Sequence, residues 1–192
     1  GLTLRGQFYR GKAVQLELPF NEGRFYVAQG GSNIVLNAHR PNESQQFAVD
    51  ILELERFGWR AGGVYPSELT RYKIFGQSVV SPCDGHVTAA VDEFKDLVPP
   101  NRDEEHPAGN HVILRCQGIK LLLAHLKEGS IVVDVDEKIE TGQLIGQVGN
   151  SGNTTEPHLH IHAENDLAAP NFDGEGVPLM LMNQFPTRNT LF

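Results

Sequence analysis

The sequence has few of the residues that would place it in several large protein classes. Only two of its 192 residues are cysteines, Cys83 and Cys116, and neither belongs to the Cys-x-x-Cys pairs typical of structural zinc sites. No run of about 18 apolar residues is present, which excludes a transmembrane helix in this sequence. We expect the cysteines to be buried thiols, with a disulfide as the alternative in an exported protein.

Basic residues are also scarce. The sequence has 16 lysines and arginines against 24 acidic residues, for a formal net charge of −8, and the basic residues are scattered. Proteins that bind nucleic acid or anionic membranes usually cluster their positive charge. We therefore expect neither kind of partner. The 40% hydrophobic and 21% charged residues are typical of a folded globular protein, which excludes global disorder.

Short apolar stretches with a period of two dominate the sequence. Residues 13–18 alternate in this way, and residues 111–125 have the pattern of a hairpin that turns at Gln117-Gly118. These patterns predict an all-β, sandwich-like or barrel-like single domain with few short helical turns. Within it we expect residues 1–36 to form an N-terminal β entry layer, packed on a main domain of residues 37–192.

The stretch EPHLHIH is the most distinctive part of the sequence. It contains His158, His160 and His162, separated by Leu159 and Ile161. On a β-strand successive side chains point to opposite faces, so the three histidines share one face, with neighbours roughly 7 Å apart. Imidazoles at this spacing can converge on one metal ion. The alternative is a solvated strand face that is merely rich in histidine.

Two further residues could join a metal site. Asp50 stands between the apolar residues Val49 and Ile51, where a carboxylate is costly unless it is paired or binds a cation. His125 ends an apolar strand, where the alternative role is to cap the strand by bonding to a loop. Carboxylate and imidazole ligands without thiolate fit catalytic zinc, which has three protein ligands and an open position for water.

These candidates lie within motifs that are ordered along the chain. The motifs are AVDI at 48–51, SPCDGHV at 81–87, AGNHV at 108–112, LAHL at 123–126, GQLIG at 142–146, GNSGNT at 149–154 and PHLH at 157–160. Over about residues 48–161 the sequence resembles the lysostaphin-type, LytM-like zinc endopeptidases, which share the duplicated hybrid motif fold and cut peptides in bacterial cell walls. The resemblance implies that Asp50 and His160 bind zinc. It also implies that His125 and His158 are catalytic histidines around the water and the scissile carbonyl.

One departure from the family pattern concerns the third zinc ligand. The usual motif is His-x-x-x-Asp, but Gln46 stands four residues before Asp50. A glutamine carbonyl is a weak, neutral ligand for zinc. A divergent branch of the family carries a histidine further upstream in the same loop, so the resemblance indicates that His39 replaces it. Gln46 itself and His162 remain the alternatives, although His162 extends away along its strand.

The resemblance implies a zinc-dependent endopeptidase that hydrolyses peptide bonds in bacterial peptidoglycan. We expect it to act as a monomer outside the cytoplasm, either secreted, in the cell wall or in the periplasm. The alternative is a metal-poor, degenerate relative that binds peptidoglycan or activates another hydrolase. The presence of Asp50, His125, His158 and His160 argues against this alternative, because a protein that no longer binds metal has no physical need for all four. A lipoyl or biotinyl carrier would need a lysine where the sequence has residues 150–153, and a phosphocarrier would have little use for Asp50.

Overall fold

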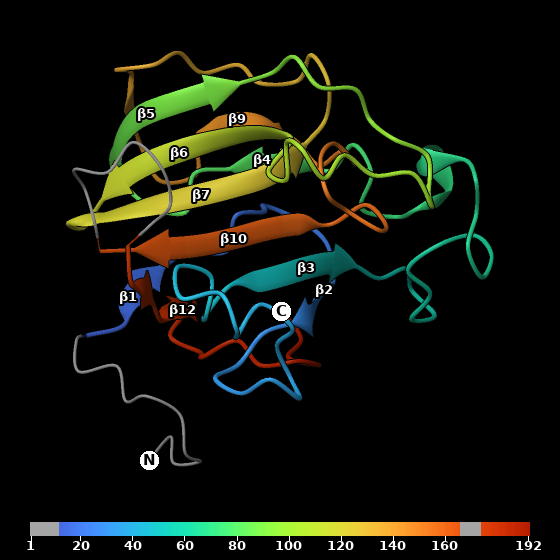
Figure 1. Cartoon of the computed structure of the whole chain (residues 1–192), viewed down its shortest axis with the longest axis horizontal. Helices are drawn as coiled ribbons and strands as arrows, with labels where there is room; N and C mark the ends of the chain where they lie inside the picture. Colours follow the sequence, from blue (N-terminus) through green and yellow to red (C-terminus); the bar gives the residue numbers. More distant parts are fainter. Residues whose placement is uncertain (1–11, 166–173) are drawn as a thin grey trace.

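Strands form almost all of the regular structure (Figure 1). The computed structural model describes residues 12–165 and 174–192. Within these ranges the only regular helical element is a 3-10 turn, η1, at Leu69–Arg71. No helix in the described part of the chain has the length and apolar character needed to cross a membrane. The prediction of an all-β fold is confirmed.

One large sheet organises the molecule. It contains eight strands in the order β2-β3-β10-β7-β6-β5-β8, with β11 paired to β10 beside this path. Their bounds are β2 Phe25–Gln29, β3 Val49–Glu53, β5 Gly85–Val91, β6 Asn110–Cys116, β7 Ile119–Leu126, β8 Lys138–Ile139, β10 Leu159–Glu164 and β11 Gly176–Val177. The hairpin predicted around Gln117-Gly118 is confirmed as β6 and β7, which pair in antiparallel fashion.

Two small sheets complete the fold. Strand β1 (Val14–Leu16) pairs in parallel with β12 (Leu179–Leu181), and β4 (Ser78–Val80) pairs with β9 (Leu144–Gln147), behind the large sheet in Figure 1. The core joins Val79 and Ile145 of the small sheet to Leu114 and Leu123 of the large one. Of the entry layer expected at residues 1–36, residues 1–11 lie outside the described part of the chain. Within residues 12–36, β2 belongs to the large sheet and β1 to a small one. Its boundary at residue 36 stays a prediction.

The expectation of two buried thiols is wrong, because Cys83 and Cys116 form a disulfide. The pairing of β5 with β6 explains why they meet. In that ladder His86 lies opposite Arg115, so the turn before β5 and the end of β6 lie together. Both cysteines are buried. The disulfide therefore joins two parts of the core that are 33 residues apart in the sequence.

The two faces of β10 differ in chemistry. Leu159, Ile161 and Ala163 belong to the main core. His160 and His162 alternate with them on the other face, and both are also buried. Antiparallel pairing places His160 directly opposite Asp50 of β3 on one side and Ala124 of β7 on the other, and it places His162 opposite Leu122. The register of β3 with β10 therefore puts the Asp50 carboxylate beside the His160 ring.

Candidate metal centre and active site

Asp50 lies between two imidazoles. Its Oδ1 atom is 2.8 Å from Nδ1 of His160, and its Oδ2 atom is 2.9 Å from Nε2 of His39. Asp50 is only 8% exposed, so its carboxylate depends on these neighbours rather than on bulk water. Asp50 and His160, which the resemblance implies as zinc ligands, are thus in direct contact. Zinc binding by this pair stays a prediction.

A loop anchored by Asn37 brings His39 to the site. The fully buried Asn37 amide donates hydrogen bonds to the carbonyls of Gly31 and Ala48, and its Oδ1 atom accepts one from the backbone N–H of His39. The side chain of Gln45 hydrogen-bonds the His39 ring. The loop thus fixes both the backbone and the ring of His39 beside Asp50.

Gln46, the residue at the usual ligand position, is held elsewhere. Its Oε1 atom accepts a hydrogen bond of 2.6 Å from the Nη1 atom of Arg40. A carbonyl oxygen that is bonded to a guanidinium is a poor ligand for a second cation, because the two positive charges would repel. This contact favours His39 over Gln46 as the third ligand, an assignment that stays a prediction.

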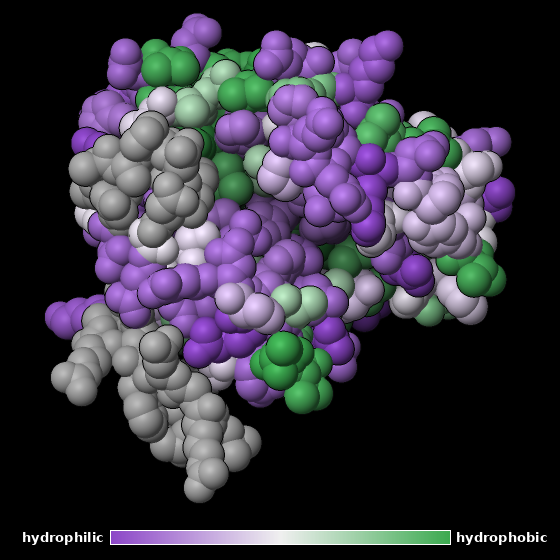
Figure 2. Space-filling view, viewed as in Figure 1, coloured by the Kyte–Doolittle hydropathy of each residue, from purple (hydrophilic) through white to green (hydrophobic). Residues whose placement is uncertain are grey.

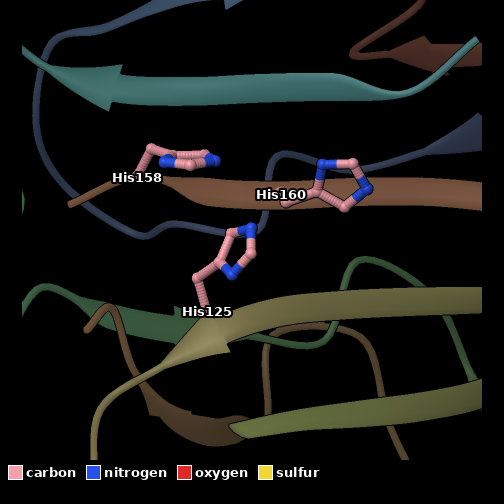
Figure 3. A group of neighbouring side chains, drawn as sticks. All are labelled: His125, His158 and His160. Atoms are coloured by element: carbon pink, nitrogen blue, oxygen red, sulfur yellow. The ribbon is translucent and has the colours of Figure 1, made fainter. Parts of the chain in front are cut away.

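His125 and His158 face the same site from opposite sides (Figure 3). His158 immediately precedes β10, and His125 reaches toward it from the end of β7. Their ring centroids are 4.7 Å apart, and Nε2 of His158 is 3.6 Å from Oδ1 of Asp50. The structure therefore brings all five predicted site residues together: His39, Asp50, His125, His158 and His160.

His125 adopts a backbone conformation that is uncommon for residues other than glycine. Its φ angle is +64°, in the left-handed region, although it lies within β7. Such a conformation persists only where the surrounding structure enforces it, and it is frequent at functional sites. Here the backbone N–H of His125 donates to the carbonyl of Ala108, and its carbonyl accepts from Gly149. The neighbouring loops therefore hold the turn in the strand that aims this ring at the site.

Ser151 holds the His125 ring, a role that the sequence did not reveal. Nδ1 of His125 donates to the Ser151 carbonyl over 2.9 Å. The Ser151 hydroxyl accepts from the backbone of Asn110 and donates to the carbonyl of Leu126. Gly109, at a φ of +56°, packs so closely on the Ser151 backbone that any Cβ atom would overlap it. The GNSGNT and AGNHV motifs therefore support one catalytic candidate.

The residues before His158 hold its ring in the same way. Nδ1 of His158 donates to the Glu156 carbonyl over 2.8 Å and also lies 3.1 Å from the Thr154 hydroxyl. The Glu156 carboxylate is bound by Nε of Arg60 at 2.7 Å. Because a carbonyl only accepts, Nδ1 carries the proton in both His125 and His158. In the neutral form of either ring, Nε2 therefore carries a lone pair rather than a proton.

Two overlapping groups in the described residues could hold a metal ion. One is His39, Asp50 and His160, and the other is His125, His158 and His160; in each, the ligand atoms lie within 4.8 Å of one another. Zinc binds nitrogen and oxygen at roughly 2.0–2.2 Å, so its ligands lie within about 4 Å of each other. The contacts of Asp50, at 2.8 and 2.9 Å, satisfy this requirement with a charged oxygen and two imidazoles. This donor set fits zinc.

Burial and charge set the protonation states of the site. Burial alone would raise the pKa of Asp50, but His158, His160 and His39 together lower it well below its ordinary value. Burial, reinforced by the neighbouring rings, lowers the pKa of His125 strongly, and burial lowers that of His160 despite Asp50. Burial also opposes protonation of His39, but Asp50 raises its pKa overall. An ionised carboxylate and neutral imidazoles are the forms that bind metals.

These shifts predict that the metal-free protein loses stability in acid. Burial lowers the pKa of His125, His160 and His162 from 6.5, so the unfolded chain binds more protons as the pH falls through that value. The raised pKa of His39 acts in the opposite sense and offsets part of the effect. Urea unfolding with a chelator present should give a smaller free energy of unfolding at about pH 5 than at about pH 7.5. Equal values at the two pH values would contradict this prediction.

A cleft of about 450 Å³ opens onto these side chains. His39, His125 and His160 line it, while Leu122 and Ala124 of β7 provide apolar surface. The corresponding face of the molecule is largely hydrophilic and is hollowed near its centre (Figure 2). The candidate metal centre is therefore accessible from solvent along an open cleft.

Comparisons with known proteins identify the family of this chain. The model of peptidase family M23 matches residues 70–171, which include His125, His158 and His160. A stretch of 56 residues is 41% identical to the peptidoglycan DD-endopeptidase ShyA of Vibrio cholerae serotype O1, and it covers 29% of this chain but only 13% of that protein. The chain thus spans a small part of this curated relative. His39 and Asp50 lie before the residues matched by the family model.

The solved structure of another M23 metalloprotease shares the fold. The M23 metalloprotease pseudoalterin from the deep sea aligns over 90% of this chain and 80% of its own, with a TM-score of 0.51 and 15% identity. The catalytic domain of lysostaphin from Staphylococcus simulans aligns over 58% of this chain and 81% of its own, with a TM-score of 0.38 and 21% identity. Because the family model matches more than half of its residues, this chain belongs to peptidase family M23.

Proposed function

We propose that this protein is a zinc-dependent endopeptidase that hydrolyses peptide bonds of bacterial peptidoglycan. The observation that carries the proposal is the buried carboxylate of Asp50, which lies within 3 Å of ring nitrogens of His39 and His160, two residues that line an open cleft. Membership of peptidase family M23 and the local identity to a peptidoglycan DD-endopeptidase support this class of substrate.

His39, Asp50 and His160 are the proposed zinc ligands. His39 would offer Nε2, His160 would offer Nδ1, and Asp50 would supply the negative charge, since these atoms already face one another. Zinc bound by three protein ligands lowers the pKa of a bound water to about 7, which supplies a nucleophile at neutral pH. The three imidazoles of the other group carry no charge to balance a dication, which favours the group with Asp50.

His125 and His158 are the proposed catalytic residues. Their Nδ1–H groups donate to backbone carbonyls, so the neutral form of each ring has its lone pair on Nε2. His125 lines the cleft, and Nε2 of His158 lies 3.6 Å from Oδ1 of Asp50. One of these rings can take a proton from the attacking water as the new carbon–oxygen bond forms. The protonated ring can then donate an N–H to the developing oxyanion, and finally its proton to the amine as the carbon–nitrogen bond breaks.

We propose that the protein works outside the cytoplasm and as a monomer. The disulfide between Cys83 and Cys116 supports the first point, because disulfides persist in oxidising compartments and are rare in the cytosol. Peptidoglycan also lies in those compartments. The monomeric state can be measured directly by light scattering.

The test uses protein purified without chelators and isolated peptidoglycan sacculi. We expect one zinc per chain by elemental mass spectrometry and the release of soluble peptides with new amino termini. A chelator such as phenanthroline should stop this release, and added zinc should restore it. Protein that holds no zinc, but binds sacculi and cuts nothing, would favour the degenerate binding module instead.

A further inference from the structure

His160 has a defined partner for each of its two ring nitrogens. On one side, Nδ1 lies 2.8 Å from Oδ1 of Asp50. On the other, Nε2 lies 2.9 Å from Nδ1 of His162. His160 and His162 are 5% and 1% exposed, and their ring planes are inclined by 75°. Water is therefore largely excluded from the contact between the two rings.

The chemistry of imidazole indicates which ring donates the hydrogen bond between His160 and His162. A neutral ring carries one N–H group and one lone pair, and a ring that binds a metal must direct its lone pair at the ion. If Nδ1 of His160 faces the ion together with Asp50, its proton is on Nε2. That N–H group then points at Nδ1 of His162, which has to accept it.

We propose that His162 is a positioning residue of the metal centre. Its Nδ1 atom accepts the hydrogen bond from Nε2–H of His160 and so fixes the tautomer and the orientation in which Nδ1 of His160 binds zinc. This inference rests on the proposed function. It gives His162 a role through another residue rather than on the metal, in agreement with its absence from both metal-binding groups found in the described residues.

The surrounding sheet keeps the His162 ring in place. His162 is the third of three alternating histidines and lies opposite Leu122 in the ladder between β10 and β7. One step further along the same face, Glu164 is bound by Lys120 through a contact of 2.6 Å between Oε1 and Nζ, and Glu164 Oε2 also accepts from the backbone of Gly174. The acceptor for His160 is therefore built on a paired strand and bordered by a buried ion pair.

Metal-binding histidines usually depend on such partners. A hydrogen bond to the second ring nitrogen fixes the tautomer of the ligand and raises its basicity, and its loss commonly weakens metal binding 10–100-fold. A side chain at position 162 that filled the same space without an acceptor would keep the packing. It would leave Nε2–H of His160 buried without a partner, which is unfavourable.

Two variants of the full chain separate these contributions. His162→Leu keeps a comparable apolar volume but removes the acceptor, whereas His162→Asn can present its amide oxygen close to the position of Nδ1. The dissociation constant for zinc is measured by competition with a chromophoric chelator. We expect it to rise about 10–100-fold in His162→Leu and to return most of the way to the wild-type value in His162→Asn.

A second measurement does not depend on affinity. Nitrogen-15 NMR of the zinc-loaded wild-type protein should find the His160 ring protonated at Nε2 and bound through Nδ1. Thermal unfolding of the metal-free variants shows whether each one folds. If His162→Leu does not fold, the NMR result and the His162→Asn variant still decide the question.

Several outcomes would overturn the inference. They are wild-type zinc affinity in His162→Leu, equal weakening in both variants, or a His160 proton on Nδ1. Failure of the proposed function has a different signature. A wild-type chain that binds no zinc would remove the metal centre itself, and the role of His162 with it. Zinc binding that survives Asp50→Asn would reject the ligand set of His39, Asp50 and His160.

Discussion

His160→Ala should remove both zinc and peptidase activity, whereas His125→Ala and His158→Ala should lose activity while zinc stays bound. Nδ1 of His160 lies 2.8 Å from the Asp50 carboxylate, at the centre of the proposed zinc site. His125 instead lines the cleft and His158 lies beside Asp50, and backbone carbonyls hold both rings. Loss of a catalytic acid or base commonly costs 100-fold or more in rate.

Zinc per chain and the rate of release of peptidoglycan peptides are measured side by side for each variant. His86→Ala is a matched control, because His86 is an exposed histidine of β5 and should change neither quantity. If all three site variants lose zinc equally, the separation of ligands from catalytic residues is wrong. Retention of zinc in Asp50→Asn as well would assign the metal to the three imidazoles His125, His158 and His160.

His39→Ala should abolish stoichiometric zinc binding, whereas Gln46→Ala should retain it. Nε2 of His39 lies 2.9 Å from Oδ2 of Asp50, while the carbonyl oxygen of Gln46 is bonded to Arg40. Removal of a direct ligand leaves two protein ligands, which is fewer than the three that catalytic zinc sites use. We therefore expect zinc affinity to fall more than 100-fold in His39→Ala, beyond the range typical for positioning residues.

Elemental mass spectrometry of dialysed protein measures this result, and circular dichroism checks that each variant folds. Gln46→Ala is the control for disturbance of the loop, because it changes the same segment and removes the partner of Arg40. Unchanged metal content in His39→Ala would reject this residue as a ligand. If only Gln46→Ala lost zinc, the third ligand would be Gln46, at the position four residues before Asp50 where the family usually has its histidine ligand.

Local pattern predicted the parts of the site that depend on strand alternation. The order of His158, Leu159 and His160 already separates a core face from a site face, and the structure confirms this for β10. The hairpin of β6 and β7 followed from its apolar strands and the turn at Gln117-Gly118. These features depend on neighbours in the sequence, which a periodic pattern records directly.

The periodic pattern of the sequence could not predict contacts between residues that are far apart in the chain. The register that sets Asp50 opposite His160 joins β3 to β10, and only the resemblance to a known family indicated that the two meet. The pattern left the disulfide between Cys83 and Cys116 as an alternative for a similar reason, since the bond requires the register of β5 with β6. The carbonyl of Ser151 left no signal either, because every residue offers a backbone carbonyl.

The position of β10 between β3 and β7 bears on when the protein becomes active. Asp50 and His160 are 110 residues apart, and pairing over such a separation is slow because a long loop has to close first. A chain synthesised only as far as β9 holds the carboxylate and His125 but neither imidazole of the later strand. On the proposed function, a growing chain therefore lacks a complete metal site until β10 has been made and paired between β3 and β7.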